Sequence, residues 1–284
     1  MSEAVLTAGP LAGPPVSPLA SPPARALFPP AVTGSLLLHT AGLAGLAAAP
    51  EAWGVVLAGL ALNHAVLAVA GLSPRSRFLG PNIARLPAAA RARGEVGLTF
   101  DDGPDRVGTP RVLDILDRHG VTASFFCIGA HAARDPGLAR EIAARGHGVE
   151  NHTYRHSNAF AFRGPVGLLA EIGRAQAVLT EASGQAPAFF RAPMGLRGPL
   201  LEPVLRRFGL SLVSWTRRGI DGVPADSGAV LARLTRGLAA GDVLMLHDGG
   251  PSGGRAAVEA LPRLLDGIAA RGLSGVSLTR AFAA

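Results

Sequence analysis

The segment EVGLTFDDGPD, from Glu95 to Asp105, is an apolar run that ends in two adjacent aspartates, Asp101 and Asp102, followed by Gly-Pro. Neighbouring side chains on a strand point to opposite faces of the sheet, so a simple core strand has no use for this pair. Adjacent carboxylates also repel each other, and burying either one costs free energy unless a cation compensates its charge. The pair therefore needs cationic partners from elsewhere in the chain.

From Glu95 onward, helix-like segments that end in glycine alternate with short apolar strands. Glycine suits the left-handed position that ends a helix, and this ending recurs at Gly120, Gly146, Gly209, Gly241 and Gly272. Thr109-Pro110 and Asp135-Pro136 predict two helix starts with side-chain caps. We expect an α/β fold, a distorted and incomplete parallel (β/α) barrel of about seven strands. The strands are expected near residues 96–101, 122–128, 148–152, 188–191, 211–215, 242–247 and 274–278.

Reactive side chains gather at the C-terminal ends of these predicted strands. Asp101 and Asp102 end the first strand, and the later strands end at His152, Arg191, Trp215 and His247. In βα barrels the active site is built at this rim of the sheet. Residues far apart in the sequence are therefore expected to converge there.

The motif NHTYRH, Asn151 to His156, places two histidines four residues apart. On a helical turn, His152 and His156 share a face and can bind one metal ion, although this spacing alone is more often structural. A carboxylate from another strand end completes a two-histidine, one-carboxylate set with open positions for water and substrate. One aspartate of the pair then ligates the ion, and the other lies beside the water that the ion activates, as a general base.

Three further residues have candidate roles around this centre. His247, which follows an apolar strand, can donate a proton to a leaving group, and Arg191 can pair with the base aspartate. Asp221 can pair with His247 and raise its pKa. A structural histidine, a surface arginine and a loop carboxylate are the alternatives for these positions.

Taken together, these motifs resemble the polysaccharide deacetylase family, the NodB-homology domain of carbohydrate esterase family four, over about residues 94–284. TFDDG resembles its first motif, which implies Asp101 as catalytic base and Asp102 as metal ligand. HTYRH resembles the second and implies His152 and His156 as the other ligands. LMLHDG resembles the fifth and implies His247 as general acid.

Two motifs depart from the pattern of the family. RAPMG resembles the third, which implies that Arg191 orients Asp101 and that the backbone N–H of Met194 helps to hold the oxyanion, although an aromatic residue is usual at that position. SWTRRGIDGV keeps Trp215 and Asp221 of the fourth motif, but Gly222 stands where a tryptophan is expected. The groove wall there is expected to be more open.

The resemblance implies a metal-dependent hydrolase that removes N-acetyl groups from the amino sugars of a polysaccharide or glycan. One divalent ion is expected, Zn²⁺ with Co²⁺ or Ni²⁺ as alternatives. Two other functions stay open: a deacetylase or deformylase of a lipid-linked amino sugar, and an inactive, membrane-tethered glycan-binding module. The intact ligand, base and acid residues argue against the inactive module.

The N-terminal third of the chain predicts a membrane anchor. Residues 1–30 are rich in Pro and Ala and indicate a disordered tail, and residues 31–49 and 52–72 are apolar and lack Asp, Glu, Lys and Arg. Each stretch reaches roughly 28–32 Å as a helix, about the thickness of a bilayer core.

We expect a transmembrane helical hairpin at 31–72, with interhelical hydrogen bonds from His39, Asn63 and His64. A basic linker at 73–93 and a catalytic domain at 94–284 follow. A signal peptide cleaved near Ala49 is the alternative for the first stretch.

The positions of the arginines bear on which side of the membrane the catalytic domain lies. Arg25 precedes the hairpin, its turn has no arginine, and five follow it, at Arg75, Arg77, Arg85, Arg91 and Arg93. The positive-inside rule then places the catalytic domain on the cytoplasmic side of a bacterial-type inner membrane, with the periplasmic or extracellular face as the alternative.

The net charge is +7, but the 27 basic residues are all arginine and are scattered, so no nucleic-acid partner is expected. The single cysteine, Cys127, excludes a disulfide framework.

Overall fold

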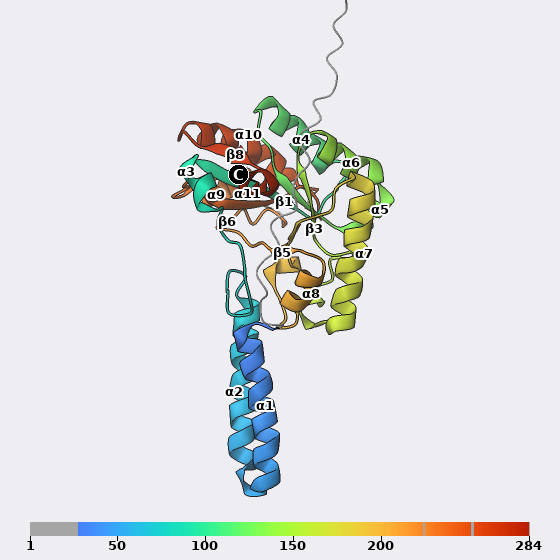
Figure 1. The fold of residues 1–284 in the computed structure, drawn as a ribbon. Helices are drawn as coiled ribbons and strands as arrows, with labels where there is room; N and C mark the ends of the chain where they lie inside the picture. The colour runs from blue at the N-terminus through green and yellow to red at the C-terminus, as the bar shows by residue number, and fades with distance from the viewer. Residues whose placement is uncertain (1–27, 224, 251–252, 284) are drawn as a thin grey trace, which may run out of the picture.

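The structure is a computed structural model that describes residues 28–223, 225–250 and 253–283. Two long helices project as a hairpin from one side of an α/β domain (Figure 1). The tail predicted for residues 1–30 lies almost wholly outside the described residues, which begin at Phe28.

The hairpin consists of α1 (Pro30–Ala48), the 3-10 turn η1 (Pro50–Ala52) and α2 (Trp53–Leu72). Both helices are long and apolar enough to cross a bilayer. Their apolar side chains are exposed, with Leu43 at 72% and Val55 at 77%. A helix that is apolar on its outward faces needs an apolar surrounding, as a membrane provides.

Polar groups join the two helices near mid-span. Asn63 Nδ2 donates to Ser35 Oγ at 2.8 Å, and the rings of His39 and His64 lie 5.1 Å apart. The predicted hydrogen bond between the helices is therefore found at Asn63. The same prediction is wrong for His39 and His64, whose Nδ1 atoms bond to carbonyls of their own helices, at Ser35 and Leu60.

The domain is built on one sheet whose paired strands are all parallel. Its order is β5-β4-β3-β2-β1-β7-β6, and β8 pairs with the start of β1. All seven predicted strands are present, and the sheet has one further described strand, β6, that was not predicted. The strands are β1 (Glu95–Asp101), β2 (Ser124–Cys127), β3 (Gly148–Asn151), β4 (Phe189–Phe190), β5 (Ser211–Leu212), β6 (Arg217–Arg218), β7 (Val243–His247) and β8 (Ser274–Val276). The predicted incomplete parallel (β/α) barrel is confirmed.

Helices follow most of the strands, and most of the helices pack on the outside of the sheet. They are α3 (Ala88–Ala92), α4 (Gly108–Arg118), α5 (Gly129–Arg134), α6 (Pro136–Ala144), α7 (Pro165–Ser183), α8 (Leu201–Arg207), α9 (Ser227–Thr235), α10 (Arg255–Ala269) and α11 (Leu278–Phe282), with 3-10 turns η2 (Phe160–Phe162) and η3 (Pro193–Gly195). The five predicted glycine endings all adopt positive φ, between 62° and 83°. Gly120, Gly146, Gly209 and Gly272 follow the ends of α4, α6, α8 and α10, as the glycine signal predicts. The helix ending predicted at Gly241 is wrong, because α9 ends at Thr235 and Gly241 lies in the turn before β7.

The two predicted side-chain caps are wrong. α4 begins one residue before Thr109, and the backbone N–H groups of Val107 and Gly108 donate to Asp105 Oδ1 instead. Asp135 does occupy the N-cap of α6, but its carboxylate pairs with Arg106 at 2.9 Å rather than with the helix.

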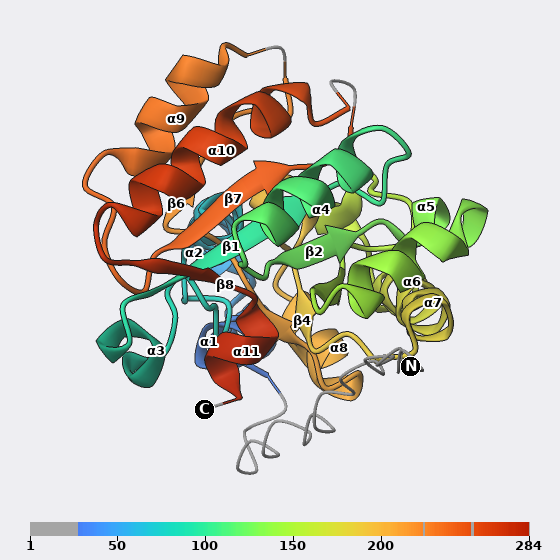
Figure 2. The same cartoon turned by 90° about the horizontal axis from the view of Figure 1, so that it is seen from above.

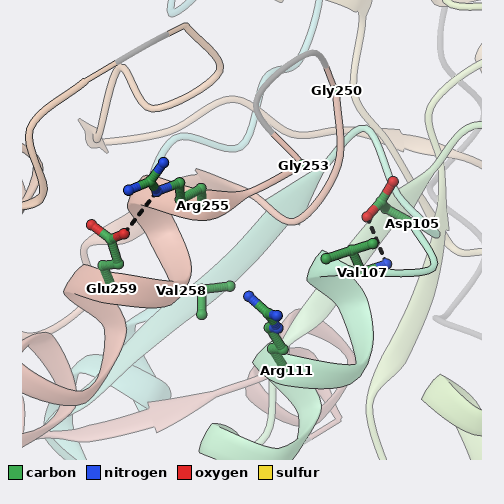
Figure 3. A pocket seen from close by; sticks show the side chains of 8 residues that line it. All are labelled: Asp105, Val107, Arg111, Gly250, Gly253, Arg255, Val258 and Glu259. Atoms are coloured by element: carbon green, nitrogen blue, oxygen red, sulfur yellow. Dashed lines mark hydrogen bonds and ion pairs between the residues drawn. The ribbon is translucent and has the colours of Figure 1, made fainter.

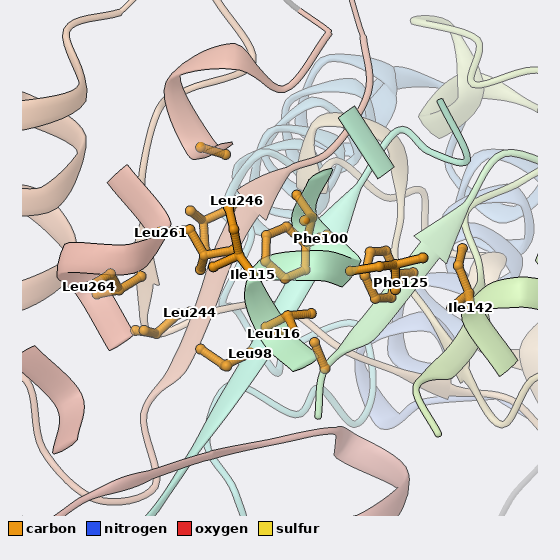
Figure 4. Close-up of a cluster of buried hydrophobic side chains, with 14 of the residues drawn as sticks. Leu98, Phe100, Ile115, Leu116, Phe125, Ile142, Leu244, Leu246, Leu261 and Leu264 are labelled. Carbon is orange, nitrogen blue, oxygen red and sulfur yellow. The ribbon is translucent and has the colours of Figure 1, made fainter. Parts of the chain in front are cut away.

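The core has two layers, because the strands are buried on both faces. On the outer face, Phe100 stacks on Phe125 at 5.2 Å beneath α4 and α10 (Figure 4). On the inner face, Phe126 packs with Val213 and Val243. Figure 2, which looks along the hairpin, shows β7, β1 and β2 side by side with α4 and α10 over them.

Part of the predicted linker bridges the end of β5 and the start of β7. Ile83 N donates to Leu212 O, and Leu86 N donates to Gly241 O, each at 2.9 Å. Residues 83–86 thus lie between the end of β5 and the start of β7, and Leu86 is buried in the inner core. The polypeptide therefore enters the barrel directly after leaving the hairpin.

Candidate metal centre and active site

The sheet register brings the predicted site residues to one edge. Asp101 is the register partner of His247 on β7, and Asn151, directly before His152, is the partner of Phe190, directly before Arg191. Parallel strands all end at the same edge, so residues from four strands converge there. The structure brings together Asp101, Asp102, His152, His156, Arg191, Asp221 and His247, with Trp215 and Met194 beside them.

Asp101 is buried against Arg191. The Nη1 group of Arg191 lies 2.5 Å from Asp101 Oδ1 and also donates to Thr99 Oγ1 at 2.9 Å. Its Nη2 donates to the carbonyl of Ser214, and its guanidinium lies over the Phe126 ring. Burial lowers the pKa of Arg191, but guanidinium stays charged in proteins, so each ion compensates the other.

Asp102 turns away from the strand toward the two histidines. Its backbone φ is 73°, a left-handed value that is uncommon outside glycine and sends its side chain out of the strand direction. Its Oδ1 lies 3.4 Å from His152 Nε2 and 3.3 Å from His156 Nε2. The two neighbouring carboxylates thus have different partners: Asp101 pairs with Arg191, and Asp102 faces the two histidines.

The predicted helical turn over His152–His156 is wrong, because the segment is a loop. Asn151 Oδ1 accepts from Thr153 N, and Thr153 Oγ1 accepts from His156 N. Thr153 and His156 adopt positive φ of 64° and 52°. These side-chain hydrogen bonds replace the helical ones and bring both imidazoles to one point, with the ring centroids 4.8 Å apart.

The donor set fits a divalent transition metal. One ligand atom from each of Asp102, His152 and His156 lies within 4.8 Å of the others, and Asp102 Oδ1 is buried with no hydrogen-bond partner in the described chain. His152 Nδ1 is hydrogen-bonded to the carbonyl of Arg191 at 2.8 Å, which leaves Nε2 to ligate. Burial and the neighbouring His152 lower the pKa of His156 to about 4, so its ring is neutral near pH 7.

Burial by itself raises the pKa of Asp102, but the contact with His152 holds it well below its usual range, together with the charge that His156 carries at the low pH where Asp102 titrates. Asp102 is therefore a carboxylate at neutral pH. A carboxylate and two imidazoles are ligands that Zn²⁺, Co²⁺ and Ni²⁺ accept, with further positions left open.

His247 and Asp221 form a second buried pair at the same edge. Asp221 Oδ1 lies 3.0 Å from His247 Nδ1, and its Oδ2 accepts from His247 N at 2.8 Å. Burial works to lower the pKa of His247, but Asp221, with the more distant Asp101 and Asp102, raises it to about 9. The imidazole is therefore protonated at neutral pH, with Nε2 free of Asp221.

Gly222 lies against the same ring. A Cβ added there would lie 3.2 Å from His247 Nε2, so the glycine leaves the imidazole room.

Trp215 and Met194 form one wall beside Arg191. The Trp215 ring lies 6.0 Å from the Arg191 guanidinium carbon and is buried. It also lies against Gly195, where a Cβ would be 2.5 Å from the indole. Met194 adopts a φ of 55° and exposes 44% of its surface. Of these two side chains, Met194 is therefore the one exposed to solvent.

One buried residue beneath the site was missed from the sequence. Asp248 accepts from Thr109 Oγ1, and its N–H donates to the carbonyl of Asp101. Thr109 Oγ1 in turn accepts from Asp105 N at 2.8 Å. Asp248 thus supports both ends of the loop that carries Asp102, and the only sequence signal was its place after His247.

A hollow of about 480 Å³ lies outside this centre, between the start of α4 and the start of α10 (Figure 3). Its charged side chains are Asp105, Arg111, Arg255 and Glu259, of which Arg255 and Glu259 pair at 3.0 Å. None of its lining residues is a metal-ligand candidate, and one of them, Gly250, lies against Asp102.

Comparisons with known proteins agree with this geometry. Residues 88–213 match the family model for polysaccharide deacetylase. A peptidoglycan-N-acetylglucosamine deacetylase of Bacillus cereus is 32% identical over 195 residues, which cover 67% of this chain and 69% of that protein. A chitooligosaccharide deacetylase of Bradyrhizobium is 35% identical and covers 56% of this chain and 72% of its own length. The structure of a family 4 acetyl xylan esterase from Clostridium thermocellum, in complex with a cobalt ion, superposes with a TM-score of 0.60. It is 31% identical, over 66% of this chain and 90% of its own.

Replacing His156 by alanine should weaken divalent-metal binding by about 10²-fold or more, because outer-shell changes alone cost 10–100-fold. Calorimetric titration of the chelator-stripped chain with Zn²⁺ or Co²⁺ measures the Kd. His119→Ala is the matched control, since His119 lies at the end of α4 and is bonded to the carbonyl of Ile115. A wild-type Kd for His156→Ala would show that this imidazole is not a ligand.

Proposed function

Since this chain belongs to the polysaccharide deacetylase family, we propose that it is a carbohydrate deacetylase that hydrolyses the N-acetyl amide of an amino sugar in a glycan. The observation that carries this proposal is the placement of three chemical units at one sheet edge. These are the buried Asp101–Arg191 pair, the Asp102–His152–His156 ligand set and the Asp221–His247 pair. Between them, the three units supply every group that amide hydrolysis requires.

We propose that Asp102, His152 and His156 hold one divalent ion, Zn²⁺ with Co²⁺ or Ni²⁺ as alternatives. Such an ion polarises an amide carbonyl and lowers the pKa of water. The family relationship to an esterase crystallised with cobalt supports a metal at this position.

Asp101 would act as general base. Its charge is preserved in a buried site by Arg191, which fixes the carboxylate through one ion pair and is itself fixed by Thr99 and Ser214. As the oxygen of water attacks the amide carbon, Asp101 takes the proton that water loses. The base is adjacent in sequence to the ligand Asp102, so it lies next to the centre where water is activated.

His247 would act as general acid. Its Nε2 proton passes to the sugar nitrogen as the C–N bond breaks, which yields acetate and a free amino sugar. The backbone N–H of Met194 would stabilise the negative oxygen that develops on the former carbonyl, and Trp215 would form a wall for the sugar. Asp101 and His247 lie on neighbouring strands in register, so base and acid flank the same point.

The inactive glycan-binding module is the second candidate, and the structure offers little in its favour. A module that only binds sugar has no need for a buried Asp101–Arg191 pair or for a histidine whose pKa is raised to about 9 by a buried aspartate.

We also propose that the hairpin at residues 31–72 anchors the chain in a bacterial-type inner membrane. The arginines after the hairpin favour a cytoplasmic catalytic domain. A C-terminal reporter enzyme that is active only in the periplasm would contradict that orientation.

The Asp101→Asn variant should keep its metal and lose turnover, because asparagine is nearly isosteric but cannot take a proton at neutral pH. General-base catalysis contributes ~10²–10⁴-fold, so kcat should fall by that factor. Acetate release from N-acetylglucosamine oligomers measures kcat, and the metal content of the same sample is determined in parallel. More than about a tenth of wild-type kcat with metal bound would remove Asp101 from the role of base.

The rate should depend on pH through His247. The acid needs its proton, so kcat/KM should be retained below the pKa of about 9 and fall as the pH rises through that value. Asp221→Asn removes the group that raises this pKa and moves the fall toward the ordinary histidine value of ~6.5, a roughly 30-fold loss at pH 8. Asp266→Asn, at an exposed residue of α10, serves as control. An unchanged profile in Asp221→Asn would exclude this pair as the source of the acid.

A further inference from the structure

The hairpin ends directly on the loop that forms one wall of the site. α2 ends at Leu72, and the carbonyl of Gly71 accepts from Arg197 N at 3.2 Å. Two residues after the helix, Pro74 lies against Gly195, where a Cβ would be 2.9 Å from Pro74 Cβ. The chain therefore leaves the hairpin already packed against residues 195–197.

Few contacts separate this junction from the base. Gly195 lies against Trp215 as well as Pro74, and it directly follows Met194. The Trp215 ring faces Arg191, which is bonded to Asp101. A path of Pro74, Gly195, Trp215 and Arg191 thus links the end of the hairpin to the catalytic carboxylate.

The surface around the junction is apolar and basic. Phe162 is 84% exposed, Val166 81% and Phe78 51%, and the first two are the most exposed large apolar side chains that the structure describes outside the hairpin. Arg75 and Arg77, also exposed, follow α2 at once. We name these five residues the junction surface. In water such a surface is costly, whereas lipid headgroups accept both apolar and cationic side chains.

These residues lie at the level where the hairpin joins the domain. The carbonyl of Ala161, next to Phe162, lies against Gly198, where a Cβ would be 2.5 Å away, and Gly198 follows Arg197. Val166 is in the first turn of α7, and Figure 1 shows the lower end of α7 reaching the level of the upper end of the hairpin. A membrane crossed by the hairpin would therefore meet this side of the domain.

We propose that the catalytic domain works lying with the junction surface on the membrane, and that its substrate is an N-acetylated amino sugar attached to a lipid of that membrane. This inference rests on the deacetylase function proposed above. A site this close to the hairpin reaches sugars held at the headgroups, and confinement of enzyme and substrate to one surface raises their effective concentration.

Membrane contact can be measured without any activity. Cys127 is buried, so Val166→Cys and Val107→Cys each present one accessible thiol for a fluorophore. Val107 is the matched control because it is also an exposed valine at the start of a helix, α4, on the side of the domain away from the hairpin (Figure 1). In vesicles of phosphatidylethanolamine and phosphatidylglycerol that contain nitroxide-headgroup lipid, the label at 166 should be quenched several-fold more than that at 107. Equal quenching at both positions would overturn membrane docking.

The substrate class is tested with the full chain in the same vesicles. The two substrates are N-acetylglucosamine carried on a polyprenyl diphosphate and a soluble N-acetylglucosamine oligomer. Val166→Asp should lower kcat/KM for the lipid-linked sugar about tenfold, since burying a valine contributes about 1.5 kcal/mol or more. It should leave the soluble substrate unchanged, and Val107→Asp should change neither.

The outcomes separate the two proposals. Acetate from both substrates at equal kcat/KM, with no selective effect of Val166→Asp, would overturn the lipid-linked assignment and leave the deacetylase intact. No acetate from either substrate would overturn the deacetylase and the substrate class with it, while the quenching result would still decide membrane contact.

Discussion

Asp101 and Asp102 put two negative charges on consecutive residues at the end of a buried strand, and the site is organised by the need to compensate them separately. Asp101 pairs with Arg191, whose guanidinium is anchored by Thr99 and the Ser214 carbonyl. The left-handed backbone of Asp102 carries its carboxylate to two histidines instead. A buried arginine without this partner, or a buried aspartate without a cation, would be strongly destabilising. The same division gives one carboxylate the role proposed for a base and the other that proposed for a ligand.

The parallel strands of the barrel place the partners of both aspartates at the same edge of the sheet. Parallel strands in register deliver Asp101 and His247 side by side, and the strand ends at β3 and β4 supply the histidines and Arg191. The hairpin is continuous with that architecture, because residues 83–86, in the segment that follows α2, bridge β5 and β7. The end of the hairpin and the candidate site therefore belong to one packed unit, which is why the membrane position proposed for the hairpin bears on the substrate proposed for the site.

Much of this arrangement could be read from the sequence, since each βα unit repeats a local signal: an apolar strand, a polar residue at its end and a helix closed by glycine. The remainder depends on tertiary contacts. The loop at His152–His156 is set by hydrogen bonds from Asn151 and Thr153 that compete with a helix. Residues 83–86 join the sheet through single bridges that leave no periodic pattern. Asp248 owes its position to Thr109, 139 residues away in the chain. Whether the hairpin would pack on the Gly195 loop could not be foreseen from either segment alone.

The central claim is that one ion, held by Asp102, His152 and His156, makes this edge of the sheet hydrolytic. The most direct measurement is acetate release from N-acetylglucosamine oligomers by the full chain in vesicles, stripped by chelator and titrated with Zn²⁺. The full chain is needed because a fragment that begins after Leu86 lacks the segment that bridges β5 and β7 and that buries Leu86 in the inner core. The account predicts no acetate from the stripped protein and recovery that saturates at one ion per chain. Acetate release by the metal-free chain at the full rate would contradict it.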